Sequence, residues 1–212
     1  GKSLISKIQN EAKIPVFSHL DGICHIYVDH EADEDIAEKI ILNSKLRRVG
    51  ICGAAETLLI DKKINDKIQS RFIKKLLQNG CEVRGDQEIY NKFENITLAS
   101  DEDWSTEYLD LIISVKLVDG VKEAVKHIYK YSSNHTETII TKNDNTANYF
   151  LENIDSSIVM HNASTQFADG GEFGMGAEIG ISTGKFHARG PVGINQLTSF
   201  KYIVRGSGQV RK

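Results

Sequence analysis

The sequence has few cysteines and no long apolar run. Its three cysteines, Cys24, Cys52 and Cys81, are widely spaced, and no two of them form a C-x-x-C pair. An odd number at such spacing argues against a disulfide framework and a zinc site, and it favours a reducing cytoplasm. No apolar stretch is long enough to cross a bilayer, and no signal-peptide pattern opens the chain. We therefore expect a cytoplasmic protein that does not enter a membrane.

A strong excess of one charge is also missing. The 212 residues carry a formal net charge of -3, which argues against a nucleic-acid-binding protein. The charged and apolar fractions are ordinary for a globular protein, and the length allows one large domain or a domain with an appendage. The chain starts at Gly1 without an initiator Met and enters a helical apolar pattern at once. We expect a piece cut from something longer.

Extended and helical patterns alternate through most of the chain. Residues 111–118 form a nearly continuous apolar run, which is typical of a strand covered on both faces. The other expected strands are 14–17, 25–28, 57–60, 81–83, 138–141 and 157–161. Helical spacing indicates helices over 33–44, 64–76, 121–128 and 144–153, with a weak one near 89–93. The alternation predicts an α/β fold with a largely parallel sheet flanked by helices.

The pattern changes in the last quarter of the chain. Residues 162–193 are rich in glycine and have little apolar periodicity, and such stretches are more often functional than filler. Residues 198–206 then alternate like a strand. Because no partner strand follows, this segment must pair backwards or with another subunit, so we expect an oligomer.

Cys52 is the candidate nucleophile. It lies between Gly50 and Gly53, where a helical pattern gives way to an apolar strand. Backbone N–H groups at the entry to a short helical turn favour a thiolate and can hold an oxyanion on an attached acyl group. The alternative is a small buried hydrophobic residue, which is the interpretation we favour for Cys24 and Cys81.

Three glycine-rich or charged segments suggest further sites. The loop 162–171 follows a strand end, where parallel α/β folds bind ligands, but it can equally be a solvated loop. The segment 174–180 superficially resembles a dinucleotide motif, yet it opens no βαβ unit, and we reject that function. Arg189, beside His187, suits carboxylate or phosphate recognition, with a structural ion pair as the alternative.

Several long segments resemble, in the same order, the gamma-glutamyl phosphate reductases of the aldehyde dehydrogenase superfamily. The matching segments are 48–59, 161–170, 173–183, 187–193 and 202–206. Chains of that family are roughly twice as long, so the resemblance implies the C-terminal half only. The missing N-terminal half would hold most of the cofactor-binding domain.

The resemblance also implies a division into three regions. Residues 1–20 would end the cofactor-binding domain, and 21–183 would form an aldehyde-dehydrogenase-like catalytic domain. Residues 184–212 would be a tail with a C-terminal oligomerisation strand, which implies a homo-oligomer.

The activity implied is the NADPH-dependent reduction of L-glutamyl 5-phosphate to L-glutamate 5-semialdehyde in proline biosynthesis. Cys52 would expel phosphate and carry the acyl group as a thioester. The resemblance implies that Glu107 binds the nicotinamide ribose. It also implies a substrate loop and two anion contacts, made up of Asn162, Ser164, Thr165, His187 and Arg189.

Two departures from the family pattern bear on this activity. Many relatives carry Asn where this chain has Gly53, which removes an amide side chain but keeps the backbone donor. Aldehyde-oxidising members carry Glu-Leu-Gly-Gly where residues 19–22 read His-Leu-Asp-Gly. A reductase needs no base to activate a hydrolytic water, so Asp21 is not expected to act as a base.

Two other functions compete with the reductase. One is a non-catalytic half-chain that acts only as a substrate-binding or oligomerisation module. The other is a cysteine hydrolase that turns over thioesters without a cofactor.

Overall fold

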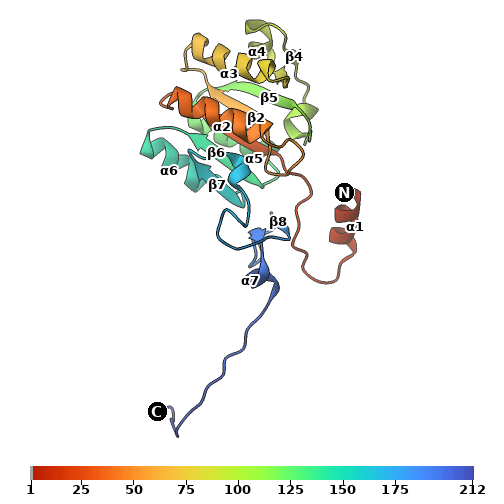
Figure 1. Cartoon of the computed structure of the whole chain (residues 1–212), viewed down its shortest axis with the longest axis vertical. Coiled ribbons are helices and arrows are strands. Elements are labelled where there is room, and N and C mark those ends of the chain that lie inside the picture. Colours follow the sequence, from red (N-terminus) through yellow and green to blue (C-terminus); the bar gives the residue numbers. More distant parts are fainter. Residues whose placement is uncertain (1) are drawn as a thin grey trace.

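A seven-stranded parallel sheet forms the centre of the fold (Figure 1). The computed structural model describes residues 2–212, so Gly1 lies outside the described part. The strands lie in the order β4-β3-β5-β2-β1-β6-β7, and each neighbouring pair is parallel. They are β1 (Cys24–Val28), β2 (Ala55–Asp61), β3 (Glu82–Gly85), β4 (Thr97–Leu98), β5 (Ile112–Val118), β6 (Thr136–Ile140) and β7 (Ile158–His161).

Helices provide most of the crossovers that parallel strands require. They are α2 (Glu34–Leu46), α3 (Asp66–Gln78), α4 (Gln87–Lys92), α5 (Gly120–Tyr131) and α6 (Asp144–Asn153). Four of them begin at a side chain that accepts a backbone N–H of the first turn, namely Asp33, Asn65, Asp86 and Asn143. These caps satisfy donors that a helix start leaves free. A 3₁₀ turn, η1 (Glu102–Ser105), precedes β5.

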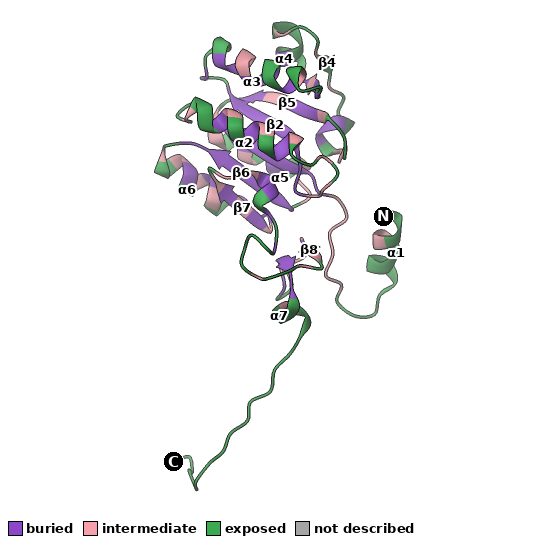
Figure 2. Ribbon diagram, in the orientation of Figure 1, coloured by how far each residue is buried: buried purple, intermediate pink, exposed green. Residues whose placement is uncertain are grey.

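The helices cover both faces of the sheet, so the central strands β1, β2, β5 and β6 are almost entirely buried, whereas the edge strand β4 is exposed (Figure 2). Successive residues of a strand point to opposite faces, and β1 shows this directly. Ile26 and Val28 pack in the core cluster that contains residues of α2, α3 and α4, whereas Tyr27 packs in the cluster of α5 and α6. The predicted fold class, an α/β fold with a parallel sheet flanked by helices, is confirmed.

The glycine-rich region lies outside the seven-stranded sheet. It contains a 3₁₀ turn, η2 (Thr165–Phe167), an antiparallel pair formed by β8 (Gly180–Ser182) and β9 (Gly190–Val192), and the short α7 (Ile194–Leu197). The predicted boundary between residues 183 and 184 falls in the connection between these paired strands. The three-region division therefore stays a prediction.

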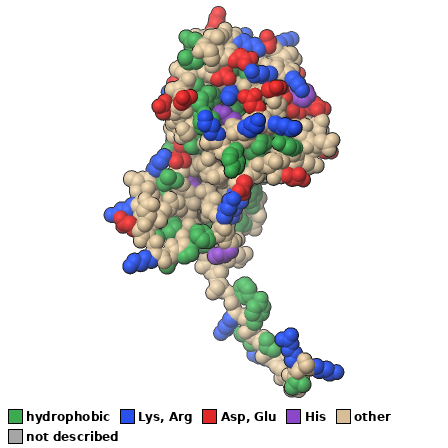
Figure 3. All heavy atoms as spheres, turned by 180° about the vertical axis from the view of Figure 1, so that it is seen from behind, with side chains coloured by type: hydrophobic (Ala, Val, Ile, Leu, Met, Phe, Trp, Pro, Cys, Tyr) green, Lys and Arg blue, Asp and Glu red, His purple; other side chains and the backbone are tan. Residues whose placement is uncertain are grey.

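Two expected strands do not form. Residues 14–17 belong to no strand, because Ile14 is 75% exposed and Pro15 lacks the N–H that a ladder requires. Residues 198–206 also join no ladder and form an arm that leaves the body (Figure 1). Apolar and basic side chains line this arm (Figure 3), and Tyr202 is 85% exposed. An alternating pattern needs a neighbouring strand to form a ladder, and none of the described residues supplies one.

The N-terminal helix lies apart from the rest of the fold. Helix α1 (Lys2–Glu11) is separated from the sheet in Figure 1 and buries none of its residues. None of the helices within residues 2–212 has the length and apolar character needed to cross a membrane.

A buried ion pair joins α2 to β2. Lys45 Nζ lies 2.5 Å from Glu56 Oε2, and both side chains are almost fully buried. Glu56 also accepts the backbone N–H of Leu109 through Oε1, at 3.3 Å. Burial raises the pKa of Glu56 from 4.5 to about 7, although Lys45 acts in the opposite direction. The folded state thus binds more protons than the unfolded chain between these values, so this group's contribution to stability falls as the pH rises through 7.

Replacing Lys45 with Met tests this pair. At pH 8 the substitution leaves an unpaired buried carboxylate, and we expect the free energy of unfolding to fall by about 3–5 kcal/mol. At pH 5 Glu56 is protonated in the folded state, so the loss is smaller. Urea unfolding at the two pH values measures the difference. Lys39→Met, an exposed position on the same helix, is the control and stays within about 0.5 kcal/mol. Equal losses at both pH values contradict this account.

Candidate active site

Cys52 lies in a turn between α2 and β2, at the amino end of the sheet. The turn is closed by the Ala54 N–H, which donates to the Ile51 carbonyl at 2.9 Å, and it forms no helix. The expected short helical turn is therefore wrong. The Cys24 thiol at the start of β1 donates to the Cys52 carbonyl at 3.1 Å. This contact ties the turn to the neighbouring strand.

Gly22 brings Cys52 and Glu107 to the same place. A Cβ atom on Gly22 would lie 2.4 Å from the Cys52 carbonyl oxygen and 2.7 Å from its Cα, so no other residue fits without displacing the turn. The Gly22 N–H donates to Glu107 Oε1 at 2.8 Å. The structure thus gathers the two residues that the sequence assigned to nucleophile and cofactor.

A pocket of about 470 Å³ opens beside the half-buried Cys52. Its wall combines two arginines that precede the turn with carboxylates from the glycine-rich region. The lining residues are Arg47, Arg48, Ile51, Cys52, Gly53, Gln166, Ala168, Asp169, Glu172 and Glu178. Such a wall offers groups of both charges to a small polar ligand.

The thiol is not predisposed to ionise. Burial raises the pKa of Cys52 to about 11, and the carboxylates of Glu178 and Glu107 act in the same direction. The backbone N–H groups of Cys52 and Gly53 lower it, as the sequence led us to expect, but their effect is smaller. The expectation that the turn favours a thiolate is therefore wrong for this structure.

Two histidines lie next to the thiol. One donor atom from each of His19, Cys52 and His135 lies within 4.8 Å of the others. The imidazole rings of His19 and His135 meet edge to face, with 5.0 Å between centroids. Burial lowers the pKa of His135 to about 3. Sequence reasoning missed His135, because nothing in the spacing of residues 19, 52 and 135 signals that they meet.

The predicted substrate loop approaches Cys52 through its backbone. A Cβ atom on Gly53 would lie 3.1 Å from the Thr165 carbonyl oxygen, and Thr165 is fully buried. The Ser164 hydroxyl accepts the hydroxyl of Ser44 at 3.1 Å and the N–H of Gln166 at 3.2 Å. The side chains of Ser164 and Thr165 therefore contact the protein interior or the loop itself.

Asn162 lies at the opposite end of the strands from Cys52, the carboxyl end. Its side chain accepts the Thr141 N–H and donates to the Thr141 carbonyl, both at 3.0 Å. Thr141 follows the carboxyl end of β6, whereas Cys52 precedes the amino end of β2. The structure does not bring Asn162 to the thiol.

His187 and Arg189 also lie outside the pocket of Cys52. The Arg189 guanidinium donates to the Asp155 carboxylate at 2.8 Å and to its carbonyl at 2.6 Å, in a separate pocket that Lys185 also lines. The His187 ring packs edge to face on Phe17. Arg189 therefore forms a structural ion pair, which was the alternative that the sequence left open. The substrate-binding roles of His187 and Arg189 stay predictions.

Arg47, Arg48 and Glu178 are pocket residues that sequence reasoning did not select. Arg48 and Glu178 fall within the segments that resemble the reductase family, so a signal was present. Only the fold shows that the helix end and the glycine-rich region share one pocket.

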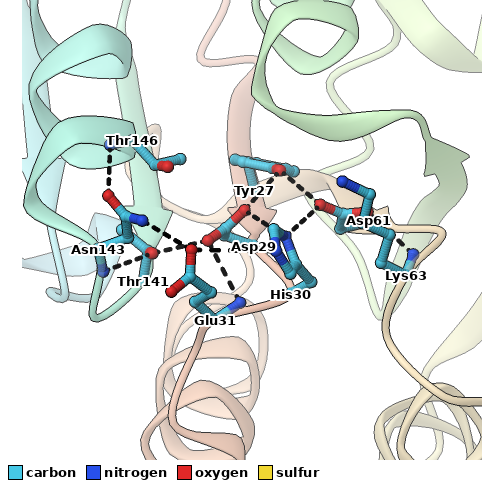
Figure 4. A network of polar contacts seen from close by, with 9 residues as sticks. All are labelled: Tyr27, Asp29, His30, Glu31, Asp61, Lys63, Thr141, Asn143 and Thr146. Carbon is cyan, nitrogen blue, oxygen red and sulfur yellow. Dashed lines mark hydrogen bonds and ion pairs between the residues drawn. The ribbon is translucent and has the colours of Figure 1, made fainter.

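A second polar cluster lies at the carboxyl ends of the central strands (Figure 4). The Tyr27 hydroxyl contacts Asp29 Oδ1 and Asp61 Oδ2 at 3.1 and 3.2 Å. His30 Nδ1 contacts the same two oxygens at 3.2 and 3.1 Å, and Thr141 donates to Asp29 Oδ2 at 2.7 Å. Because these buried carboxylates already have partners, the cluster serves to hold the ends of β1, β2 and β6 together.

Comparison with known proteins agrees with this architecture. No protein-family model matches the chain. Among solved structures, an acetylating aldehyde dehydrogenase from Geobacillus thermoglucosidasius superposes with a TM-score of 0.75 at 17% identity, covering 100% of this chain and 56% of that one. At this identity only the fold is shared, and it is the aldehyde-dehydrogenase-like α/β fold.

Other relatives are much more similar. The chain is 62% identical over 211 residues to the gamma-glutamyl phosphate reductase of Parvibaculum lavamentivorans and 59% identical to that of Brucella suis. Each match covers 100% of this chain and 50% of the relative. The crystal structure of the same enzyme from Thermotoga maritima matches with a TM-score of 0.94 at 47% identity, covering 100% of this chain and 51% of that one. The resemblance to gamma-glutamyl phosphate reductase is confirmed over the whole chain, which spans about half the length of these relatives.

The pKa of Cys52 can be tested by removing one nearby charge. Glu178→Gln keeps an acceptor for the Gly170 N–H but removes a carboxylate that raises the thiol pKa. We expect Cys52 to react with iodoacetamide about two- to tenfold faster at pH 8, a change of up to one pKa unit. Peptide mass spectrometry identifies the modified cysteine. Glu172→Gln, an exposed residue of the same pocket, is the control. An unchanged rate in Glu178→Gln contradicts the assigned cause.

Proposed function

We propose that this chain carries the acyl-transfer cysteine of an NADPH-dependent gamma-glutamyl phosphate reductase. The reaction converts L-glutamyl 5-phosphate to L-glutamate 5-semialdehyde and phosphate in proline biosynthesis. The observation that carries the proposal is the Cys52 turn, where the thiol lines a pocket and the Gly22 N–H, which lies against the Cys52 backbone, holds Glu107. Similarity over the whole chain to proteins named as this reductase supports it.

The first step is attack of the Cys52 sulfur on the acyl carbon. A C–S bond forms, the C–O bond to phosphate breaks, and phosphate leaves with the electron pair. The N–H groups of Cys52 and Gly53 lower the thiol pKa, and we assign to them the stabilisation of the oxyanion that develops on the neighbouring carbonyl. Removing one such donor typically costs about 100- to 1,000-fold in rate.

The thiol needs a proton acceptor for this step, because its pKa lies well above neutral pH. His19 fits the role. Its Nδ1 lies 2.7 Å from the Ile181 carbonyl, which can only accept, so Nδ1 carries the hydrogen. The other nitrogen, Nε2, then keeps a lone pair that can accept a proton, and one ring nitrogen of His19 lies within 4.8 Å of the Cys52 sulfur.

Glu107 fits the contact expected for a nicotinamide cofactor. Its Oε1 is fixed by the Gly22 N–H, and the carboxylate is close enough to Cys52 to influence the thiol pKa. The second oxygen can accept a ribose hydroxyl beside the sulfur. NADPH, when bound, supplies the hydride that replaces the sulfur on the acyl carbon. Cys52 then returns to a thiol as the aldehyde leaves.

The remaining parts of the proposal concern the rest of the protein. A further half would supply most of the cofactor-binding domain, with residues 21–183 as the catalytic domain. The exposed arm 198–206 would pair with another copy, which would make a homo-oligomer, and the enzyme would act in the cytoplasm. The half-length match and the exposed apolar side chains of the arm support this arrangement.

A half-chain that only binds substrate or partners is the second candidate. One observation favours it for the chain taken alone. The arm 198–206 exposes apolar side chains such as Tyr202 that another copy can cover, whereas Asn162 and Arg189, which were predicted to bind substrate, are bonded elsewhere and lie outside the pocket of Cys52.

Cys52→Ser tests the nucleophile in the intact enzyme. With the weaker nucleophile, we expect phosphate-dependent NADP⁺ reduction by glutamate 5-semialdehyde to fall by about a thousandfold or more. Absorbance of the reduced cofactor measures the rate. Cys81→Ala, a buried cysteine in the core cluster of α2 and α3, controls for loss of a thiol. Turnover that persists in Cys52→Ser excludes the covalent role.

Glu107→Gln tests the cofactor contact. The amide retains an acceptor for the Gly22 N–H but loses the charged acceptor for a ribose hydroxyl. A hydrogen bond to a charged group contributes about 1.5–3 kcal/mol, so we expect KM for NADPH to rise about tenfold or more. Glu102→Gln, an exposed residue of η1, serves as the control. If both variants give the same KM, Glu107 does not bind the cofactor.

A further inference from the structure

Three donor groups that are distant in sequence converge at Cys52. His19 precedes β1, Cys52 precedes β2, and His135 directly precedes β6. Their donor atoms lie within 4.8 Å of one another. Ligands bound to one tetrahedral zinc ion would lie about 3.3–3.7 Å apart, given bonds of about 2.0–2.3 Å. A small inward movement of the side chains therefore suffices to surround an ion.

Both histidines have Nδ1 engaged and Nε2 left for a further ligand. His19 Nδ1 donates to the Ile181 carbonyl at 2.7 Å. His135 Nδ1 lies 2.9 Å from the Thr136 hydroxyl oxygen. Ligating histidines are commonly oriented in this way, by a hydrogen bond from the nitrogen that does not bind the metal.

His135 provides an independent sign of a missing ligand. The residue is 0% exposed, and its Nε2 has no hydrogen-bond partner among the described residues. A buried polar atom without a partner is costly and calls for an explanation. A ligand bound at this nitrogen would satisfy it.

We propose that His19, Cys52 and His135 form a binding site for a thiophilic divalent cation of the zinc class. Two imidazole nitrogens and one thiolate suit Zn²⁺, and three protein ligands leave a fourth position open for water or a substrate oxygen. On binding, the metal–sulfur bond replaces the S–H bond, and the proton leaves to solvent. The carboxylates of Glu107 and Glu178 act on the same sulfur and favour a cation there.

The consequence is a reversible block of the nucleophile. A sulfur bonded to the metal cannot attack an acyl phosphate, and it is shielded from alkylation and oxidation. The sequence argued against a zinc site because the three cysteines are widely spaced and form no C-x-x-C pair. This site needs no such spacing, since the sheet brings its ligands together.

Co²⁺ alone, added to the reduced and metal-free intact protein, tests the site without any turnover. We expect one Co²⁺ per chain and a thiolate-to-cobalt charge-transfer band in the near ultraviolet, which Zn²⁺ abolishes by displacement. Zn²⁺ should also slow alkylation of Cys52 at least about tenfold, and a chelator should reverse the effect. Because catalysis is not measured, failure here is distinct from failure of the proposed function.

Variants assign the ligands. Cys52→Ser should remove the band, and His19→Gln should weaken Co²⁺ binding at least about tenfold. His161→Gln and Cys81→Ala are matched controls that should leave both unchanged. Circular dichroism reports whether the buried His135→Gln variant folds; if it does not, the half-buried His19 carries the test. The proposal is overturned if no band appears, if the band survives in Cys52→Ser, or if Cys24→Ala removes it instead.

Discussion

The close approach of Gly22 to the Cys52 backbone is the constraint on which the site depends. With no side chain at Gly22, the segment before β1 can lie against the turn before β2, and its N–H is free to hold Glu107. The register of β1 and β2 is irregular between Cys24 and His25, immediately beside this contact. The starts of β1 and β2 thus lie side by side. The Cys52 thiol, the Glu107 carboxylate and the two histidines lie around this point.

The surroundings of Cys52 favour the protonated, unreactive form of its thiol. Burial and two carboxylates hold the proton on Cys52, while the two backbone amides act in the opposite direction. Such a thiol reacts only where a base takes the proton or a positive group replaces it. Behind the turn, the pair of Lys45 and Glu56 fixes the end of α2 against β2. The site therefore combines a rigid support with a thiol that stays protonated and unreactive in the absence of ligand.

Much of the fold could be predicted from the sequence, because periodicity reports burial. Apolar runs such as 111–118 revealed strands covered on both faces, and residues 144–153 formed the expected helix. The arm 198–206 has the pattern of a strand without a partner among the described residues, and pattern alone cannot supply one. Cys52 and Glu107 were found from motifs, whereas His135 was missed, because its role depends on which strand ends meet. The raised pKa of Cys52 likewise depends on burial and on Glu178, which lies far away in sequence.

The central claim is that Cys52 carries the acyl group. The most direct measurement is to mix the intact enzyme with glutamate 5-semialdehyde and NADP⁺ without phosphate, and to locate the covalent product by peptide mass spectrometry after acid quenching. Without phosphate the acyl group has no acceptor, so the account predicts one glutamyl group per chain on the peptide that contains Cys52. It also predicts an equal amount of reduced cofactor. Reduced cofactor without any adduct at Cys52, or an adduct at another residue, would contradict the account.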